Sequence, residues 1–487
     1  MPAKKTSAKR GRRPAAKRRR SSKGTLAPSA VFLINMIPKS LSAETSQDSE
    51  PHLTVNPANP LQIVGTAFTP DPAGGGQAPI YISSDGGASW KLNSIVPSVP
   101  ASIGTGDITT GFSGNGTRLY AGILNAGSGD LQFLRTANPF LPSPMTILSS
   151  RSNGDQPFTV ATRKGTKDLV YIGDNDFNSP GGKTATVDES LNASATTPAF
   201  NSVRVEKRTT LGQDGPQTRP SCHADGTVYA AFYRWRAGTG NFQANTFVIT
   251  SADVIVVRDD HSGSGANPFT SLVDPGDGLP GVRVVQGVSF PFMIHGTAAT
   301  GQQRLGGSIS VAVDPNNSST VYLAYGDRQP GSVLTLHVRV SKNRGQTWSG
   351  DSLTIPNATN GALAVTTNGV IGFLYQQIRG TGASQRWQTH LRRSTDFVNW
   401  SDLILADTPG TSPVKTFDPY LGDYDHLAAN GTTLYGIFSA NNTPDKANFP
   451  NGVVYQRNAN FTTHRLLKLD GTTVVAPSID PFFFKVT

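Results

Sequence analysis

Two short stretches place arginines directly after aromatic residues: "YRWR" (residues 233–236) and "YGDR" (residues 325–328). A guanidinium group is a planar fork of donors that suits a carboxylate or a sulfate, and an aromatic face suits a sugar ring. The structural alternative is that charged residues cap strands and form turns wherever these occur. Together with two further arginines at related positions, the pattern predicts a binding set for an anionic group: Arg219, Arg234, Arg236, Arg304 and Arg328.

Groups that could transfer protons or attack a carbon atom lie at similar positions. The stretch "DPYLGDYDH" sets Tyr420 and Tyr424 among aspartates, and these are the best nucleophile candidates of the chain. Asp155, Asp327 and Asp418 are the candidates for proton transfer. Two carboxyl groups that meet at about 5–9.5 Å can hydrolyse a glycosidic bond. The sequence does not show which carboxyl groups pair.

One stretch alternates oxygen ligands as calcium loops do: "GDNDFN", with Asp174, Asp176 and Asn178. The glycine and the glutamate that complete such a loop are missing, so a turn is the favoured interpretation. The eight histidines lack the spacing of a zinc site. We therefore expect no cofactor, with calcium at this stretch as the alternative.

The elements that must position these residues are short strands. Apolar and polar residues alternate in brief runs that end at Gly, Asn-Gly or Asp-Gly, which is typical of antiparallel strands. The runs recur in seven similar units, and repeats of roughly 50 residues with four strands each are typical of propeller blades. The prediction is an all-β, seven-bladed β-propeller, with six blades or a set of β-sandwiches as alternatives. The units start at Glu50, Gly106, Asp155, Arg219, Gly306, Gly361 and Asp418.

A turn motif recurs within these units. "SSDGGASW" and "SKNRGQTW" share one spacing, and "STDFVNW" (residues 394–400) is a shortened copy without the glycine. The Ser and Asp side chains can accept backbone N–H bonds, glycine allows a positive φ, and the tryptophan can pack between neighbouring sheets. The motif residues are Ser83, Asp85, Gly87, Trp90, Ser341, Asn343, Gly345 and Trp348.

The pattern S-x-D-x-G-x-x-W resembles the Asp-box, or BNR repeat, of the sialidase propeller superfamily. The resemblance implies that these turns lie on one face and that the substrate groove lies on the opposite face. It also implies three arginines on a substrate carboxylate, an aspartate as acid/base and a tyrosine nucleophile activated by a glutamate. The chain departs from this pattern, because the early Arg-Ile-Pro signature is missing and Arg219 in "TRPS" is its nearest equivalent. The activating glutamate would be Glu189 or Glu206, or an aspartate in its place.

The first residues are strongly basic. Residues 4–23 contain 11 Lys and Arg, which leaves 32 basic against 33 acidic residues (43 − 11 = 32) in the rest of the chain. Like charges repel and nothing apolar is present to bury, so residues 1–24 are predicted to be a disordered tail. Such a tail fits nucleic acid, a membrane surface or another anionic polymer, and it also fits a solubilising role alone.

A short apolar run follows the tail, "TLAPSAVFLINMI" (residues 25–37). It suits a strand that closes the last blade better than a signal peptide, because Asn35 interrupts it and Lys39 lies near the supposed cleavage point. Residues 25–49 are thus predicted to be a closing strand and linker, and residues 50–487 the propeller. The final segment of the chain is the alternative closing strand. Cys222 is the single cysteine, so no internal disulfide framework forms.

Two functions from different classes fit these observations. The first is a monomeric, carbohydrate-active propeller that binds and hydrolyses acidic glycans, in which case the enzyme is a sialidase-like glycoside hydrolase. The second is a non-catalytic scaffold whose rim docks a protein and whose tail tethers the complex. The superfamily resemblance favours a secreted or cell-surface protein, while the basic tail leaves a nuclear or cytoplasmic location open. Fold alone does not choose between them.

Overall fold

The computed structural model describes most of the chain after the basic tail. The described residues are 1–2, 30–69, 77–97, 99, 103–179, 182, 184–211, 218–241, 244, 246–295, 301–304, 308–332 and 334–487. The expected disordered tail falls almost wholly on residues 3–24, which lie outside them.

Strands dominate the described residues, and six sheets have four antiparallel strands in chain order. Three of these sheets are β2 (Ser49–Val55), β3 (Ile63–Phe68), β4 (Ala78–Ser83) and β5 (Lys91–Val96); β6 (Ile108–Phe112), β7 (Leu119–Leu124), β8 (Leu131–Thr136) and β9 (Thr146–Arg151); and β10 (Gly154–Lys164), β11 (Lys167–Asp176), β12 (Ala185–Ser190) and β13 (Asn201–Arg204). The next three are β14 (Arg219–Cys222), β15 (Val228–Thr239), β16 (Val248–Asp259) and β17 (Val282–Pro291); β20 (Ile309–Asp314), β21 (Asn317–Asp327), β22 (Thr335–Ser341) and β23 (Leu353–Pro356); and β24 (Ala358–Val365), β25 (Ile371–Arg379), β26 (Arg386–Ser394) and β27 (Ser401–Pro409).

The remaining large sheet joins both ends of the described chain. Its order is β28-β29-β34-β1-β30. The strands are β28 (His426–Asn430), β29 (Thr433–Asn441), β34 (Ile479–Val486), β1 (Val31–Asn35) and β30 (Val454–Tyr455). The N-terminal run and the final segment, which the sequence offers as rival closing strands, are both used, because β34 pairs with β29 and β1 pairs with β34. Closure removes the open edges that a broken ring would expose.

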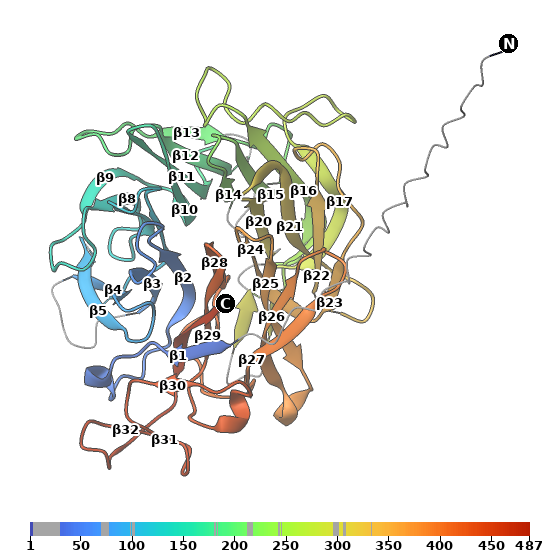
Figure 1. Ribbon diagram of the computed structural model, residues 1–487. Helices are drawn as coiled ribbons and strands as arrows, with labels where there is room; N and C mark the ends of the chain where they lie inside the picture. Colours follow the sequence, from blue (N-terminus) through green and yellow to red (C-terminus); the bar gives the residue numbers. More distant parts are fainter. Residues whose placement is uncertain are drawn as a thin grey trace.

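The first strands of these sheets form a ring. β2 contacts β6, and the contacts continue through β10, β14, β20, β24 and β28 back to β2. Figure 1 shows the sheets arranged around a common centre, with β2, β10, β14, β20, β24 and β28 facing it. This arrangement of four-stranded antiparallel sheets confirms the all-β propeller architecture and excludes separate sandwiches for the described residues.

Strand periodicity explains how the sheets pack against one another. Alternate side chains of a strand point to opposite faces. In β15, Tyr229, Ala231 and Tyr233 belong to one apolar layer, whereas Ala230 and Phe232 belong to the layer on the other face. Every pair of neighbouring sheets shares such a layer, so the core of the protein is a set of apolar layers between sheets.

Smaller elements decorate the ring. They are the hairpin β18 (Met293–His295) and β19 (Gln302–Arg304), the three-stranded sheet β31 (Ala459–Asn460), β32 (Arg465–Leu467) and β33 (Val474–Val475), and the 3-10 helices η1 (Lys39–Leu41), η3 (Gly382–Ser384) and η4 (Lys446–Asn448). Among the described residues, no helix is long and apolar enough to cross a membrane.

The two full copies of the repeated turn have the same geometry. The hydroxyl of Ser83 accepts the N–H of Gly87 (2.9 Å), and that of Ser341 accepts the N–H of Gly345 (2.9 Å). Both glycines have positive φ, 85° and 81°. The shortened copy places Phe397 with φ 62° where these turns use glycine, so it strains a bulky residue to make a related turn.

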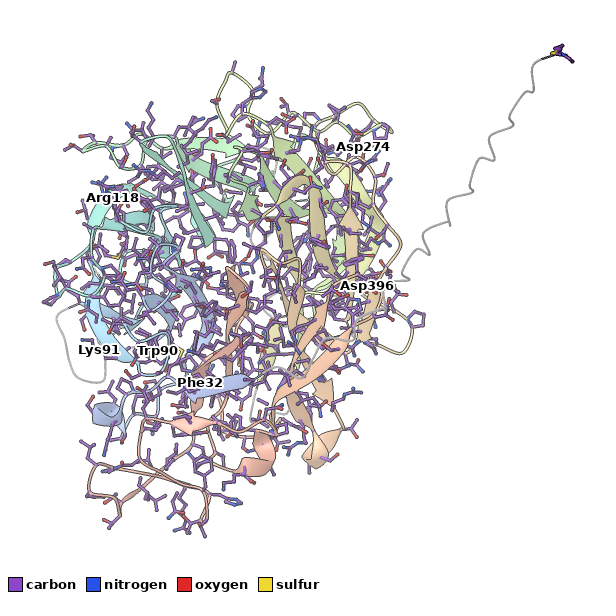
Figure 2. The ribbon with its side chains drawn as sticks, viewed as in Figure 1. Phe32, Trp90, Lys91, Arg118, Asp274 and Asp396 are labelled. Carbon is purple, nitrogen blue, oxygen red and sulfur yellow. The ribbon has the colours of Figure 1, made fainter. Side chains whose placement is uncertain are left out.

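The tryptophan of each full turn bonds back to its glycine, since the indole N–H donates to the carbonyl at 3.2 Å in the first turn and at 3.1 Å in the second. Trp90 is buried and packs against Phe483 of β34 and beside Phe32 of β1 (Figure 2), so it fills the seam between the first and the closing sheet. The third tryptophan, Trp400, reaches the preceding sheet through Ser352 (2.9 Å). The contacts of Trp90 and Trp400 thus agree with the expectation that these tryptophans pack between neighbouring sheets.

Candidate functional site

The first strands of three sheets each begin with a break in the pairing register, and the three breaks lie at the same end of the ring. β2, β10 and β24 each contain a register shift there, and the shifts hold Glu50, Gln156 and Asn360 at φ 53°, 53° and 57°. Bulges re-aim side chains and strained φ values gather at functional sites. The turns with Ser83 and Ser341 lie at the opposite end of their sheets, because Ser83 pairs with Ile63 at the far end of β3.

Arg219, the first residue of β14, lies at the centre of this end. It is only 6% exposed, and its guanidinium carbon lies 4.1 Å from the ring centre of Phe158 and 5.2 Å from that of Tyr424. Burial lowers the pKa of Arg219 to about 10, opposed by Tyr424 and nearby carboxyl groups. The arginine forms no ion pair within the described part of the chain.

Acidic and polar side chains from other sheets surround Arg219. The carboxyl groups of Asp423, Asp107 and Glu50 interact electrostatically with its guanidinium. The amide of Gln156 donates to Asp423 (2.7 Å), and the N–H of Asp423 donates to Glu50 (3.2 Å). These residues come from five different sheets or the loops that lead into them. We call the set the mouth cluster: Glu50, Asp107, Gln156, Arg219, Asp423 and Tyr424.

Several atoms of the mouth cluster are buried without a hydrogen-bond partner. They are Oδ1 of Asp107, Oε1 of Gln156, Nε and Nη1 of Arg219 and the hydroxyl of Tyr424. Buried polar atoms are almost always paired in folded proteins, so a group of orphans at one place indicates a bound ligand or ordered water. The set contains acceptors, donors and one hydroxyl that can do both.

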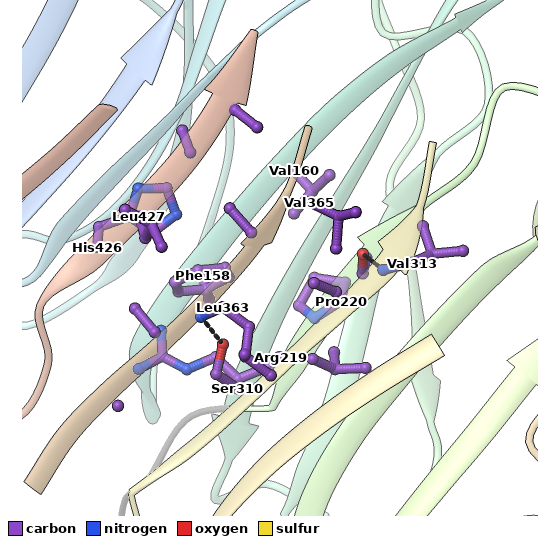
Figure 3. A pocket seen from close by; sticks show the side chains of 18 of the residues that line it. Phe158, Val160, Arg219, Pro220, Ser310, Val313, Leu363, Val365, His426 and Leu427 are labelled. Carbon is purple, nitrogen blue, oxygen red and sulfur yellow. Dashed lines mark hydrogen bonds between the residues drawn. The ribbon is translucent and has the colours of Figure 1, made fainter. Parts of the chain in front are cut away.

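A cavity of about 310 Å³ in the centre of the ring is lined by one member of this cluster, Arg219. Arg219, Phe158 and His426 lie together at one end of it, and the side chains of Val160, Val313 and Val365 line the rest (Figure 3). The polar end is therefore the end at which the first strands begin.

An adjoining cavity of about 290 Å³ shares Phe158 and His426 with the first and adds His52. The two imidazole rings stack at 3.9 Å. Burial and, to a smaller extent, the nearby Arg219 lower the pKa of His426 to about 3. Both rings are thus neutral at physiological pH, since the pKa of His52 is also lowered by burial.

The predicted arginines do not all gather at one place. Arg219 is in the mouth cluster, whereas Arg234 and Arg236 both bind Asp253 within the β15–β16 hairpin, at 2.9 and 3.3 Å. Arg328 is exposed after β21, and its backbone N–H donates to Ser289. Arg304 ends β19, and its side chain lies outside the described part of the structure.

The predicted catalytic residues are similarly divided. Tyr424 lies against Arg219, and Asp155 precedes Gln156 and accepts its N–H (2.8 Å). Tyr420 is buried beside Trp387, and its hydroxyl donates to the carbonyl of Pro413 (2.8 Å). The other two aspartates lie elsewhere on the rim. Asp327 accepts the N–H of Ser289 (3.1 Å), and Asp418 pairs with Lys415.

Three members of the cluster are not in the predicted site. Glu50 and Asp107 stand at the beginning of repeat units, which is the sequence signal that could have selected them. Gln156 occupies the position in the third unit that Glu50 occupies in the first, but its uncharged side chain is not a candidate acid, base or nucleophile. Its importance comes from its bulged backbone and its bond to Asp423.

The stretch considered for calcium is held by an arginine. Arg151 pairs with Asp176 (3.0 Å), Asp188 (2.8 Å) and Asp174. The amide N–H of Asn178 donates to Asp176 (2.9 Å) in a turn. Within the described residues, no group of three or more His, Cys, Asp or Glu side chains is arranged to hold a metal ion.

No protein-family model matches the chain, and no curated protein matches it. Solved structures do match over most of its length. They include an alpha-L-arabinofuranosidase from Fusarium graminearum (11% identity, 93% of this chain and 97% of that chain, TM-score 0.41) and an alpha-L-arabinanase from Penicillium chrysogenum in complex with arabinobiose (11%, 93% and 98%, TM-score 0.40). A third is Sqt1 from Chaetomium thermophilum, bound to the N-terminus of a ribosomal protein (12%, 82% and 87%, TM-score 0.38). These values are too low to carry an argument about activity.

Proposed function

We propose that this protein is a seven-bladed propeller that binds a saccharide at the mouth cluster and hydrolyses a glycosidic bond there. The observation that carries the proposal is the group of unpaired buried donors and acceptors of Asp107, Gln156, Arg219 and Tyr424, of which Arg219 also lines a ligand-sized cavity. Sugar hydroxyl groups both donate and accept, so they can satisfy all of these atoms. The resemblance of the repeated turns to the Asp-box supports the same class of function.

Tyr424 is the nucleophile in this proposal. Burial raises the pKa of its phenol well above the usual value, and Asp107 and Glu50 raise it further, so the phenol needs a base. One of these two carboxylates takes the phenolic proton as the oxygen bonds to the anomeric carbon. A second carboxyl group protonates the leaving-group oxygen as the glycosidic bond breaks. Water then attacks the anomeric carbon and gives a proton to this second carboxylate. The bond to the tyrosine oxygen breaks, and the phenolic proton returns from the first carboxyl group to Tyr424.

This proposal keeps fewer of the arginines that the sequence predicts as ligands of an acidic glycan. Arg219 remains, because its Nε and Nη1 have no partner among the described residues. Arg234 and Arg236 both pair with the one carboxylate of Asp253. A sialidase-like site with three arginines on one carboxylate would need Arg304 or Arg328 to complete it.

Hydrolysis of a panel of fluorogenic glycosides tests the proposal. With a substrate that the wild type cleaves, Tyr424→Phe should lower kcat/KM by about a hundredfold or more, because the nucleophile is lost. Tyr420→Phe is the matched control, since that hydroxyl bonds to Pro413 away from the cluster and its loss should leave turnover nearly unchanged. Absence of both turnover and saccharide binding across the panel would overturn the proposal.

A further inference from the structure

Residues 421–423 approach the ring more closely than a larger side chain would allow. They directly precede Tyr424, whose ring centre lies 5.2 Å from the guanidinium carbon of Arg219. Gly422 has φ 104°, and a Cβ atom on it would lie 2.3 Å from the backbone nitrogen of Glu50. Glycine is the residue that permits both this backbone conformation and so close an approach. The backbone beside the proposed nucleophile therefore packs directly on the start of β2.

Two members of the mouth cluster hold this backbone. The N–H of Glu50 donates to the carbonyl of Leu421 (3.3 Å), and its carboxylate accepts the N–H of Asp423 (3.2 Å). The amide of Gln156 donates to the carboxylate of Asp423 (2.7 Å). Glu50 and Gln156 both have φ 53°, a strained conformation that persists only where the surrounding structure fixes it. Both strained residues thus bond to the same short segment.

Two buried amides outside the mouth cluster hold the same residues. Gln303 of β19 accepts the N–H of Leu421 (2.8 Å) and donates to the carbonyl of Gly422, so its amide bonds to this backbone as a neighbouring strand would. Asn360, near the start of β24, has φ 57° and donates to the same carbonyl (3.3 Å) and to Gln376 (2.9 Å). The two side chains are 2% and 1% exposed. A buried amide is costly unless it is hydrogen-bonded, so these bonds fix both side chains and the segment together.

We infer that Gln303 and Asn360 are positioning residues that hold Asp423 and Tyr424 against Arg219, an inference that rests on the proposed function. Neither side chain lines the two cavities described above, so both act through residues 421–423. A reacting group that is displaced by about 1 Å can lose about a hundredfold in rate. Bonds that fix the backbone next to Tyr424 therefore bear directly on turnover.

Hydrogen exchange of the full chain without a ligand tests whether these amides fix the segment. In Gln303→Ala the N–H of Leu421 loses its acceptor, so a peptide covering residues 420–424 should exchange about tenfold faster than in the wild type. Asn360→Gly is the second variant if the first unfolds. Glycine adopts φ 57° without strain, so this change removes the bond to Gly422 and leaves the backbone conformation accessible.

Turnover of a fluorogenic glycoside that the wild type cleaves tests whether the segment positions the nucleophile. In Gln303→Ala and in Asn360→Gly, kcat should fall by about tenfold or more while KM changes by less than about threefold. A general loss of folded protein would lower the amount of active enzyme and would not change the exchange of one peptide selectively.

Gln377→Ala is the matched control, because it also removes a buried amide, one that donates to the carbonyl of Pro356 (2.7 Å). Its exchange in residues 420–424 and its kcat should equal those of the wild type. Faster exchange with unchanged kcat would overturn the inference and leave the proposed function standing, and so would a lower kcat with unchanged exchange. If the wild type neither binds nor cleaves any glycoside of the panel, the proposed function is overturned, and the inference with it.

Discussion

Two buried arginines of this protein have opposite surroundings. Arg457 lies where the closing sheet meets the N-terminal segment and is fully buried. It pairs with Asp480 (3.0 Å) and donates to the carbonyls of Ser42 (3.0 Å) and Glu44 (2.5 Å). Arg219 is almost as buried, yet it has aromatic rings on its faces and two donor nitrogens without a partner.

The difference teaches how a buried charge can be assigned to structure or to binding. Removing a guanidinium group from water is costly unless ion pairs and hydrogen bonds replace the lost water. At Arg457 the protein supplies partners for both terminal nitrogens and leaves only Nε without one, so we assign this residue to structure. At Arg219 it does not, so a ligand or water must supply them. The degree of burial alone does not separate the two arginines, but their ion pairs and hydrogen bonds do.

The largest expected effect is on stability at Arg457. Arg457→Met should lower the free energy of unfolding by about 3–5 kcal/mol, because Asp480 and Glu44 would remain buried without their cation. Arg219→Met should cost less, because it breaks no ion pair among the described residues, although it removes a cation that interacts with nearby carboxyl groups. Urea unfolding followed by tryptophan fluorescence measures both, and equal losses would remove the distinction.

The next effect is a pH dependence of the free energy of unfolding, and it arises at Glu44 beside Arg457. Burial raises the pKa of Glu44 from 4.5 to about 7, Asp480 adds to this, and Arg457 opposes it. A carboxyl group whose pKa is higher in the folded than in the unfolded state stabilises the fold least when ionised. Its contribution should therefore fall by about 3 kcal/mol as the pH rises from about 4.5 to 7 and then level off.

Glu44→Gln isolates that contribution, because other buried carboxyl groups such as Asp48 also titrate. The variant should lose less stability than the wild type over the same pH range. Parallel pH profiles of the two proteins would contradict the assignment. The mouth cluster provides the contrast, since Arg219→Met should leave this part of the profile unchanged.

The smallest effect separates two copies of the repeated turn. Gly87→Ala places a methyl group onto the ring of Phe483 at φ 85°, and it should cost about 3 kcal/mol. Gly345→Ala would place its methyl group 3.0 Å from Leu272 and 3.6 Å from Tyr229, at φ 81°, and it should cost about 1 kcal/mol, chiefly from backbone strain. Thermal unfolding of the two variants compares them, and a larger loss at Gly345 would contradict this ranking.

The sequence predicts the repeated elements well, because each is specified locally. Alternating apolar runs specify strands, and the Ser-Asp-Gly-Trp spacing specifies a turn in which the Ser83–Gly87 and Trp90–Gly87 hydrogen bonds are local. The recurrence of these elements was enough to predict a propeller. Residues 31–35 pair with the final strand, so the two segments that the sequence offers as alternative closing strands lie side by side.

The site was predicted only in part, because its residues are adjacent in space and distant in the chain. Arg219 and Tyr424 were both selected, but their contact across 205 positions (424 − 219) has no local signal. Arg234 and Arg236 looked like binding residues because their partner, Asp253, faces them from the next strand. Gln156 could be recognised only once its bulged backbone was seen.

The amino-acid sequence by itself thus determined the strands, the turns and the repeat, since short-range periodicity and backbone preferences decide these features. Only the tertiary structure decided which polar groups are paired. Pairing depends on which residues the ring brings within a few ångströms of one another, and side chains from five sheets meet at the mouth cluster. That decision separates Arg457, which pairs with Asp480, from Arg219, whose Nε and Nη1 have no partner among the described residues.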